Sequence, residues 1–137
     1  MKRFLATVTI LGVACLGLTL LSALGADKKA QHPPMLAHNV YFSLKDHSQA
    51  AKESLVQDSH RYLSPIPGIV FYAAGTLSDA DRDVNDRDFD VALHVVFKDK
   101  AAMLKYLDHP QHLEYVNKHK PNWKKVRVFD SDVSGAK

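Results

Sequence analysis

The chain has 137 residues, of which 46% are hydrophobic and 24% are charged, which is enough for one domain of ordinary size. This composition excludes disorder as the main state, and the single cysteine, Cys15, excludes a disulfide scaffold. Lys2 and Arg3 stand in an acid-free N-terminal stretch, and the rest of the chain is close to neutral, with a net charge of about +1. A domain so close to neutrality does not have the charge of a nucleic-acid-binding protein, so no nucleic-acid partner is predicted.

Residues 1–26 have the pattern of a signal peptide. Two basic residues precede an apolar stretch from Phe4 to Leu24, and Ala23 and Gly25 suit positions −3 and −1 of a signal peptidase site. We expect cleavage after Gly25, or after Ala26, and therefore an exported protein, periplasmic or secreted. The alternative is an uncleaved anchor, because about 20 apolar residues can span a bilayer. In that case the N-terminal segment would be the contact with the membrane.

A polar linker and a strand come next. Residues 27–35 contain two adjacent prolines and are typical of a linker. From Leu36 to Leu44 the residues alternate in polarity, which predicts a β-strand. One face of this strand carries Leu36, His38, Val40, Phe42 and Leu44.

Two helical regions and three further strands follow. Ser48 is a good N-cap for an amphipathic helix that extends to about Leu63, where a proline-rich turn ends it. Asp99 and Pro110 mark the starts of two shorter helices. Runs of β-branched and aromatic residues predict strands at 69–77, 89–97 and 126–129, with a charged loop at 78–88.

The order β-α-β-β-α-α-β predicts an α+β fold of the ferredoxin-like type, with antiparallel strands and helices on one side of the sheet. The other side of the sheet then stays uncovered, although it carries apolar and aromatic residues. We place Tyr41, Val70, Tyr72, Ala92 and Val96 on it. Such a patch usually marks an interaction surface, and two sheets about 10 Å apart in a homodimer would bury it.

The most specific motif is Tyr106-Leu107-Asp108-His109-Pro110-Gln111-His112. It resembles the Y-x-x-H-P-x-H signature of the stress-responsive dimeric α/β barrel family, often called Dabb. The resemblance covers residues 36–133, and other landmarks occur in the expected order: His38, Pro67-Gly68, Gly75, Phe89-Asp90 and Asp130. It implies a ferredoxin-like subunit that forms a homodimeric α/β barrel.

One branch of this family, the plant polyketide cyclases, implies a catalytic role for the motif. In that branch the last histidine of the signature is a general acid/base and the tyrosine assists, with no metal or redox cofactor. The corresponding positions here are His112 and Tyr106, and His38 corresponds to the histidine of the first strand. Val91 stands where the cyclases have another pocket histidine, so the substrate does not carry over.

We expect a small apolar pocket between the sheet and the helices. The residues predicted to line it are His38, Val40, Phe42, Val91, Leu93 and His109. The alternative for each histidine is structural, because a packed imidazole can bond a backbone carbonyl or, in His109-Pro110, begin a helix.

No cofactor and no metal are predicted. The chain has eight histidines, but a closed metal site needs three or four converging ligands, and the acidic loop 78–88 lacks the glycine and terminal glutamate of a calcium loop. We therefore expect an exported homodimer that binds a small apolar or aromatic ligand or serves in a stress response. The alternative is a cofactor-independent lyase, cyclase or isomerase that uses His112 and Tyr106. A third alternative is a metal-dependent or oxygen-using member of the wider group of dimeric barrels.

Overall fold

A computed structural model of the protein describes residues 34–80 and 82–135. The predicted signal peptide and nearly all of the predicted linker lie outside these residues. Within the described part of the chain, no helix has the length and apolar character needed to cross a membrane.

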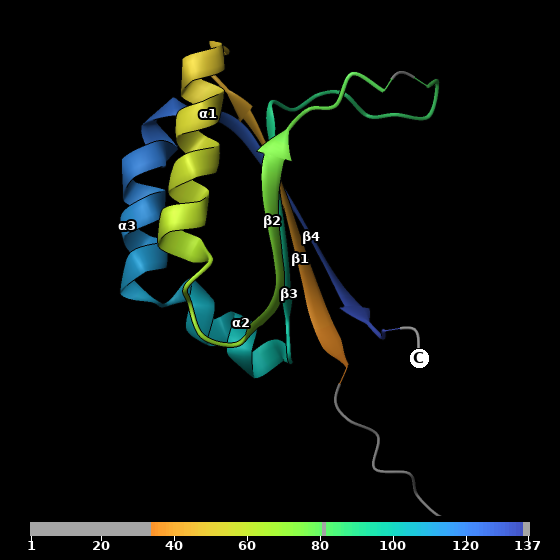
Figure 1. Ribbon diagram of the computed structural model, residues 1–137, viewed down its shortest axis with the longest axis vertical. Helices are drawn as coiled ribbons and strands as arrows, with labels where there is room; N and C mark the ends of the chain where they lie inside the picture. The colour runs from red at the N-terminus through yellow and green to blue at the C-terminus, as the bar shows by residue number, and fades with distance from the viewer. Residues whose placement is uncertain (1–33, 81, 136–137) are drawn as a thin grey trace, which may run out of the picture. The chain divides into compact units, whose positions relative to one another are not determined.

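Four antiparallel strands form one sheet (Figure 1). The strands are β1 (Met35–Leu44), β2 (Ile69–Thr76), β3 (Val91–Phe97) and β4 (Trp123–Val133), and their spatial order is β2-β3-β1-β4. The first strand therefore lies inside the sheet and pairs with both β3 and β4.

The helices pack on one face of this sheet (Figure 1). They are α1 (Gln49–Asp58), which continues as a short π-helix, Ser59–Leu63, then α2 (Lys100–Leu107) and α3 (Pro110–His119), which a 3₁₀ turn, Lys120–Asn122, follows. The predicted N-caps are confirmed, since the side chain of Ser48 accepts from Ala51 N and that of Asp99 from Ala102 N. This arrangement confirms the predicted ferredoxin-like α+β fold.

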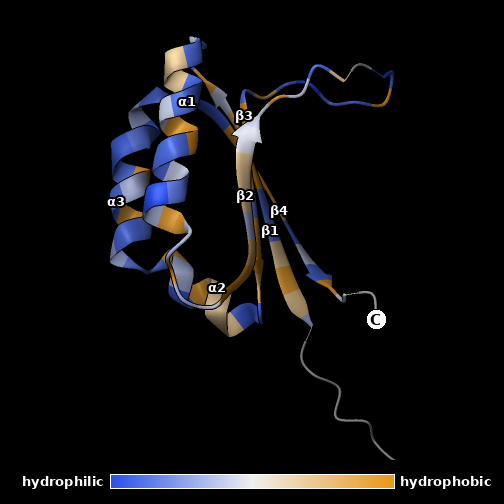
Figure 2. Ribbon diagram, in the orientation of Figure 1, coloured by the Kyte–Doolittle hydropathy of each residue, from blue (hydrophilic) through white to orange (hydrophobic). Residues whose placement is uncertain are grey.

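The core lies between the helices and the sheet. Side chains from β1 and β3 meet side chains from all three helices there, and the members include Phe42, Val91, Leu93, Leu55, Met103 and Tyr115. Figure 2 shows mainly hydrophilic residues along α3, alternating hydrophilic and hydrophobic bands along α1, and hydrophobic stretches in the strands. The alternating pattern of β1 and β3 is explained by this one-sided burial.

The predicted end of the first helical region at Leu63 is confirmed, although its last turn changes type, and two other predicted boundaries need correction. The helix that begins after Ser48 changes to a π-helix at Ser59, whose hydroxyl donates to the Leu55 carbonyl and bonds the Tyr115 hydroxyl. The third strand begins at Val91 rather than Phe89, and Asp90, which precedes it, accepts from Leu44 N through its carboxylate. The last strand is much longer than 126–129, since it pairs with the whole of β1.

The predicted position of Tyr72 on the uncovered face is wrong. The pairing of β2 with β3 shifts between Ile69 and Phe71, so a β-bulge moves Tyr72 to the helix side. There it packs against the core and its ring lies 5.6 Å from that of His60. Phe71 takes the outward position, opposite Val96, with 55% of its surface exposed.

We call the sheet surface opposite to the helices the outer face. In the observed register it carries Asn39, Tyr41, Phe71, Ala92, His94, Val96, Arg127 and Phe129. Tyr41 is central, and its ring lies within 6 Å of the rings of Phe89, His94 and Phe129. The prediction that one face of the sheet is rich in apolar and aromatic residues and is left uncovered by the helices therefore holds.

Candidate functional site

The motif of residues 106–112 forms the corner between α2 and α3. Tyr106 is in the last turn of α2, and His109 is the N-cap of α3, where its Nδ1 accepts from Gln111 N at 3.3 Å. Pro110 occupies the first turn, where its missing N–H has no cost. The corner brings the rings of Tyr106 and His112 to a centroid distance of 4.7 Å.

His112 uses one ring nitrogen to hold this corner together. Its Nδ1 lies 3.0 Å from the carbonyl oxygen of Leu107, an acceptor at the end of α2 that has no partner within the helix. A carbonyl only accepts, so Nδ1 carries the hydrogen and Nε2 has a free lone pair. Burial lowers the pKa of His112, the Leu107 carbonyl opposes this shift, and nearby His38 adds to it. The imidazole is therefore neutral at neutral pH.

Tyr106 lies behind His112 in the core, with 1% of its surface exposed. Its ring is 4.9 Å from that of Phe97 and 6.2 Å from that of His38. Burial raises the pKa of Tyr106 above its usual value, and Tyr72 and Tyr115 add to the shift. The phenol therefore keeps its proton and can act only as a neutral hydrogen-bond partner.

His38 belongs to the same group of rings and is 7% exposed. Its Nδ1 lies 2.6 Å from Oδ1 of Asp130, which is directly opposite in the β1–β4 register. A carboxylate accepts this hydrogen bond from Nδ1–H and so fixes the orientation of the ring. From the sequence, Asp130 is only a landmark of the family resemblance, because nothing in its local pattern indicates the partner 92 residues away.

The structure therefore brings three of the predicted site residues together, His38, Tyr106 and His112, from β1, α2 and α3. The other predicted pocket residues have different places. His109 caps a helix, while Val40, Phe42, Val91 and Leu93 are members of the buried core. The two cavities described in the structure lie elsewhere, and neither is lined by these three rings. The assigned catalytic and pocket roles stay predictions.

A second polar group connects the far ends of α1 and α3. Asp58 Oδ2 is 2.7 Å from Lys118 Nζ and 2.9 Å from His119 Nε2. Burial alone would raise the pKa of Asp58, but the hydrogen bonds from Lys118 and His119 hold it below its usual value. Burial lowers the pKa of His119 despite Asp58, so Lys118 supplies the positive charge of this group. Its position between two helices indicates a structural role.

The described residues contain no cluster of three or more histidine, cysteine, aspartate or glutamate side chains placed to hold a metal ion.

The model of the stress responsive A/B barrel domain, Dabb, matches residues 36–133, most of the chain. The chain belongs to the Dabb family. The match begins within β1 and ends with β4, so it covers the whole ferredoxin-like domain. The family resemblance of the motif and the predicted fold are both confirmed.

Solved structures similar to this Dabb domain differ in what they are described to do. A Dabb family protein from Mesorhizobium loti is 26% identical, with a TM-score of 0.62 over 74% of this chain and 99% of that one. A hydroxynitrile lyase from Passiflora edulis is 23% identical, with a TM-score of 0.62 over 76% of this chain and 97% of the lyase. A dimeric ferredoxin-like protein of unknown function from Thermobifida fusca is 19% identical, with a TM-score of 0.61 over 74% and 92%.

These likenesses show the fold and do not transfer an activity. A comparison with curated proteins gave no match.

Proposed function

We propose that this Dabb protein is an exported homodimer in which each subunit binds a small, largely apolar molecule at Tyr106 and His112. The observation that carries the binding proposal is the pair of complementary polar atoms at one place in an apolar core. Tyr106 offers a hydroxyl that stays protonated, and His112 offers the unprotonated Nε2. A ligand with a carbonyl or hydroxyl group on an aromatic or aliphatic body has the matching chemistry.

The difference in exposure between His112 and Tyr106 determines which of them an entering ligand would contact first. His112 is partly exposed in the first turn of α3, while Tyr106 is buried behind it. A ligand that enters from the helix side therefore meets the His112 ring before the phenol. The Asp130–His38 pair forms the back of the site on the sheet side.

The dimer is supported by the outer face. Phe71 and Phe129 are more than half exposed there, and apolar surface of this kind on an otherwise covered sheet is stabilised by a partner. Pairing with a second copy buries the same residues of both subunits around a two-fold axis. The Thermobifida fusca protein, which shares the fold, is described as dimeric.

Binding can be tested by following the histidine ring signals of the purified protein by NMR during additions of benzaldehyde, acetophenone and phenol. We expect at least one of these probes to shift the His112 signals and to change its pKa, with no effect on the exposed His60 as an internal control. Tyr106→Phe should weaken the effect of probes that accept a hydrogen bond from the phenol. If His112 titrates near 6.5 and ignores every probe, it is a structural histidine and the binding proposal fails.

A second candidate function is cofactor-independent acid/base catalysis, and the fixed tautomer of His112 favours it. A neutral imidazole with a free Nε2 can take a proton from a carbon beside a carbonyl, and the Tyr106 hydroxyl can stabilise the resulting oxyanion. This proton removal can be measured although the natural substrate is not known, by following the exchange of the methyl protons of acetophenone for deuterium in D₂O.

We expect the exchange rate to rise with pH through the lowered pKa of His112 and to fall about 100-fold or more in His112→Gln. Gln replaces the imidazole by an amide, which can donate a hydrogen bond but cannot act as a base. An unchanged rate in His112→Gln would exclude His112 as the base.

The export part of the proposal rests on residues 1–26 alone. Expression of the full chain in a bacterial host, followed by mass measurement of the product, tests it: cleavage after Gly25 or Ala26 supports export, and an intact N-terminus in the membrane fraction supports the anchor.

A further inference from the structure

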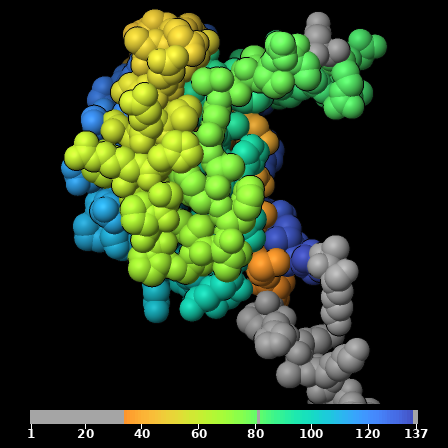
Figure 3. Space-filling model, viewed as in Figure 1, coloured from red at the N-terminus to blue at the C-terminus, as the bar shows by residue number. Residues whose placement is uncertain are grey.

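We infer that the loop between β2 and β3 is an arm that clasps the second subunit, with Val84 as its contact residue. This inference rests on the proposed homodimer and goes beyond it by naming a surface outside the sheet. The arm consists of residues 77–80 and 82–90. It runs away from the helix layer on the side of the outer face (Figure 1) and stands clear of the body of the domain (Figure 3).

The arm is held in place by β4. Asp86 forms an ion pair with Arg127, whose other terminal nitrogen donates to the Asp88 carbonyl at 2.8 Å. Lys125 Nζ lies 2.7 Å from the Asp88 carboxylate, and Ser43 Oγ donates to the Asp88 carbonyl at 2.8 Å. Both cations belong to the outer-face side of β4. The base of the arm is therefore tied to the surface that the dimer would bury.

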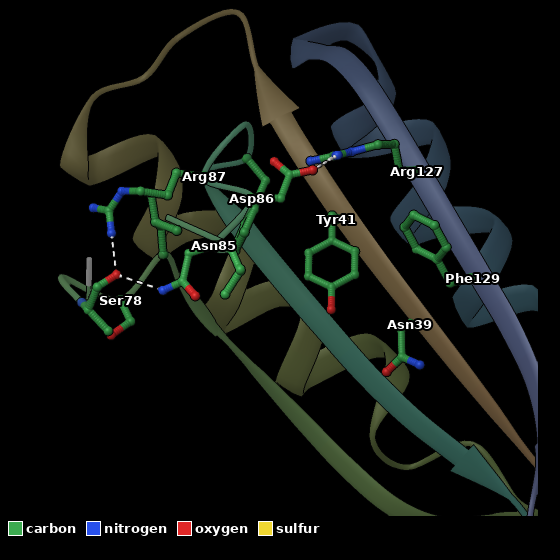
Figure 4. Close-up of a pocket in the computed structure, with 12 residues that line it drawn as sticks. Asn39, Tyr41, Ser78, Asn85, Asp86, Arg87, Arg127 and Phe129 are labelled. Carbon is green, nitrogen blue, oxygen red and sulfur yellow. Dashed lines mark hydrogen bonds and ion pairs between the residues drawn. The ribbon is translucent and has the colours of Figure 1, made fainter. Parts of the chain in front are cut away.

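The two limbs of the arm are also tied to each other. Asn85 Nδ2 donates to the Ala80 carbonyl at 3.0 Å, and Arg87 donates to the same oxygen (Figure 4). Arg82 donates to the side-chain oxygen of Asn85 at 3.1 Å. A loop ordered in this way has already lost much of its conformational entropy, so it binds a partner at lower cost than a flexible loop does.

A hollow of about 560 Å³ lies between the arm and the outer face. Apolar and polar residues line it in equal number: Tyr41, Leu77, Ala80, Val84, Phe89 and Phe129 beside Asn39, Ser78, Asn85, Asp86, Arg87 and Arg127 (Figure 4). Val84 is the only large apolar residue of the loop 78–88, and it is 81% exposed. A second subunit that enters this hollow would bury Val84, which the isolated subunit leaves exposed.

The second copy of the chain is the occupant that fits this hollow, because the hollow is continuous with the outer face. Tyr41 and Phe129 belong to both surfaces, and their rings are 5.8 Å apart. When two outer faces meet around a two-fold axis, each arm reaches beyond its own sheet, and side chains of the other subunit enter the space under it. The dimer would then be closed by two symmetric arms as well as by the paired sheets.

The test compares the dimer dissociation constants of the purified protein, Val84→Asp and Leu104→Asp by sedimentation velocity over a range of concentrations. Leu104 is a matched control, since it is an exposed apolar residue on α2 in the helix layer. Val84→Asp is expected to raise the constant roughly ten-fold or more, because it places a charge without a partner where the dimer would bury a valine. Leu104→Asp should leave the constant unchanged.

A photo-cross-linking measurement checks the contact directly. With p-benzoylphenylalanine at position 84, illumination should join two chains, whereas the same group at position 104 should not. If Val84→Asp weakens the dimer no more than Leu104→Asp does, and position 84 gives no cross-link, the inference about the arm is wrong. The proposed homodimer is not affected by that result. A wild-type protein that stays monomeric would overturn the homodimer itself. Far-ultraviolet circular dichroism confirms that each variant is folded.

Discussion

We expect the substitution Gly68→Ala, which adds a single methyl group, to lower the free energy of unfolding considerably. It is the only described residue with a positive φ, 98°, and it joins the proline-rich turn to β2. A Cβ at this position would lie 2.8 Å from the Cβ of Ala102, a buried residue in the first turn of α2. Since that helix carries Tyr106, the close approach of Gly68 also positions the candidate site.

Two costs add in Gly68→Ala. The left-handed backbone conformation costs an L-residue about 1–2 kcal/mol, and overpacking against Ala102 costs about 1–3 kcal/mol more. The lower entropy of the unfolded chain returns up to about 1 kcal/mol. The free energy of unfolding should therefore fall by roughly 2–4 kcal/mol, which lowers the midpoint of urea unfolding by about 1–2 M.

The matched control is Gly75→Ala in β2, where an added Cβ would meet nothing within 4 Å. Alanine at a strand position without strain should be neutral or stabilising by about 0.5–1 kcal/mol. Urea unfolding followed by circular dichroism, with all variants at one protein concentration, measures both changes. In the Ala102→Gly background, which itself costs about 1 kcal/mol for glycine in a helix, Gly68→Ala should lose only the part due to backbone conformation, because the steric part is gone. Equal midpoints for Gly68→Ala and Gly75→Ala would refute the argument.

Three further predictions concern hydrogen bonds and pH. Ser59→Ala removes the hydroxyl between the Leu55 carbonyl and the buried Tyr115 hydroxyl, so the free energy of unfolding measured with urea should fall by about 1–3 kcal/mol. The control Ser64→Ala removes an exposed hydrogen bond to the His60 carbonyl and should lower it by less than about 0.5 kcal/mol. Asp99→Ala removes the N-cap of α2 and should cost about 0.5–2 kcal/mol, whereas Asp99→Asn should keep most of the stability; equal losses in both variants would show that the charge, rather than the cap, matters. Burial lowers the pKa of His112 and His119, so the unfolded chain binds protons below about pH 6.5 that the folded chain does not, and the stability present above that pH should decline on acidification. Urea unfolding at pH 7.5 and 5.5 checks this, and stability that is flat or higher at pH 5.5 would contradict the assignment.

The local pattern was sufficient to predict most of the elements. Strict alternation from Leu36 to Leu44 fits a strand with one buried face, and the caps Ser48 and Asp99 and the prolines mark where helices begin and end. The contact between Tyr106 and His112 was also within reach, because the two residues lie in one short motif that bends the chain once. These features depend on neighbours close in sequence.

The remaining features depend on register and packing. Asp130 became the partner of His38 only because β1 and β4 pair in one particular alignment. Likewise, the change to a π-helix at Ser59 accompanies the bond to Tyr115, which lies 56 residues further along the chain. The two residues of each pair are far apart along the chain, so no local sequence pattern could predict either contact.

The sequence by itself therefore determined the family, the order of elements and the presence of an apolar sheet face without helices. Tertiary structure decided which side chains occupy that face, because a bulge in β2 puts Phe71 there in place of Tyr72. Side chains alternate between the two faces of a strand, so a shift of one residue moves each side chain to the opposite face. It also decided the place of the arm, which the pairing of Asp86 with Arg127 draws toward the outer face. That pairing joins residues from a loop and a distant strand, so only the folded chain could bring them together.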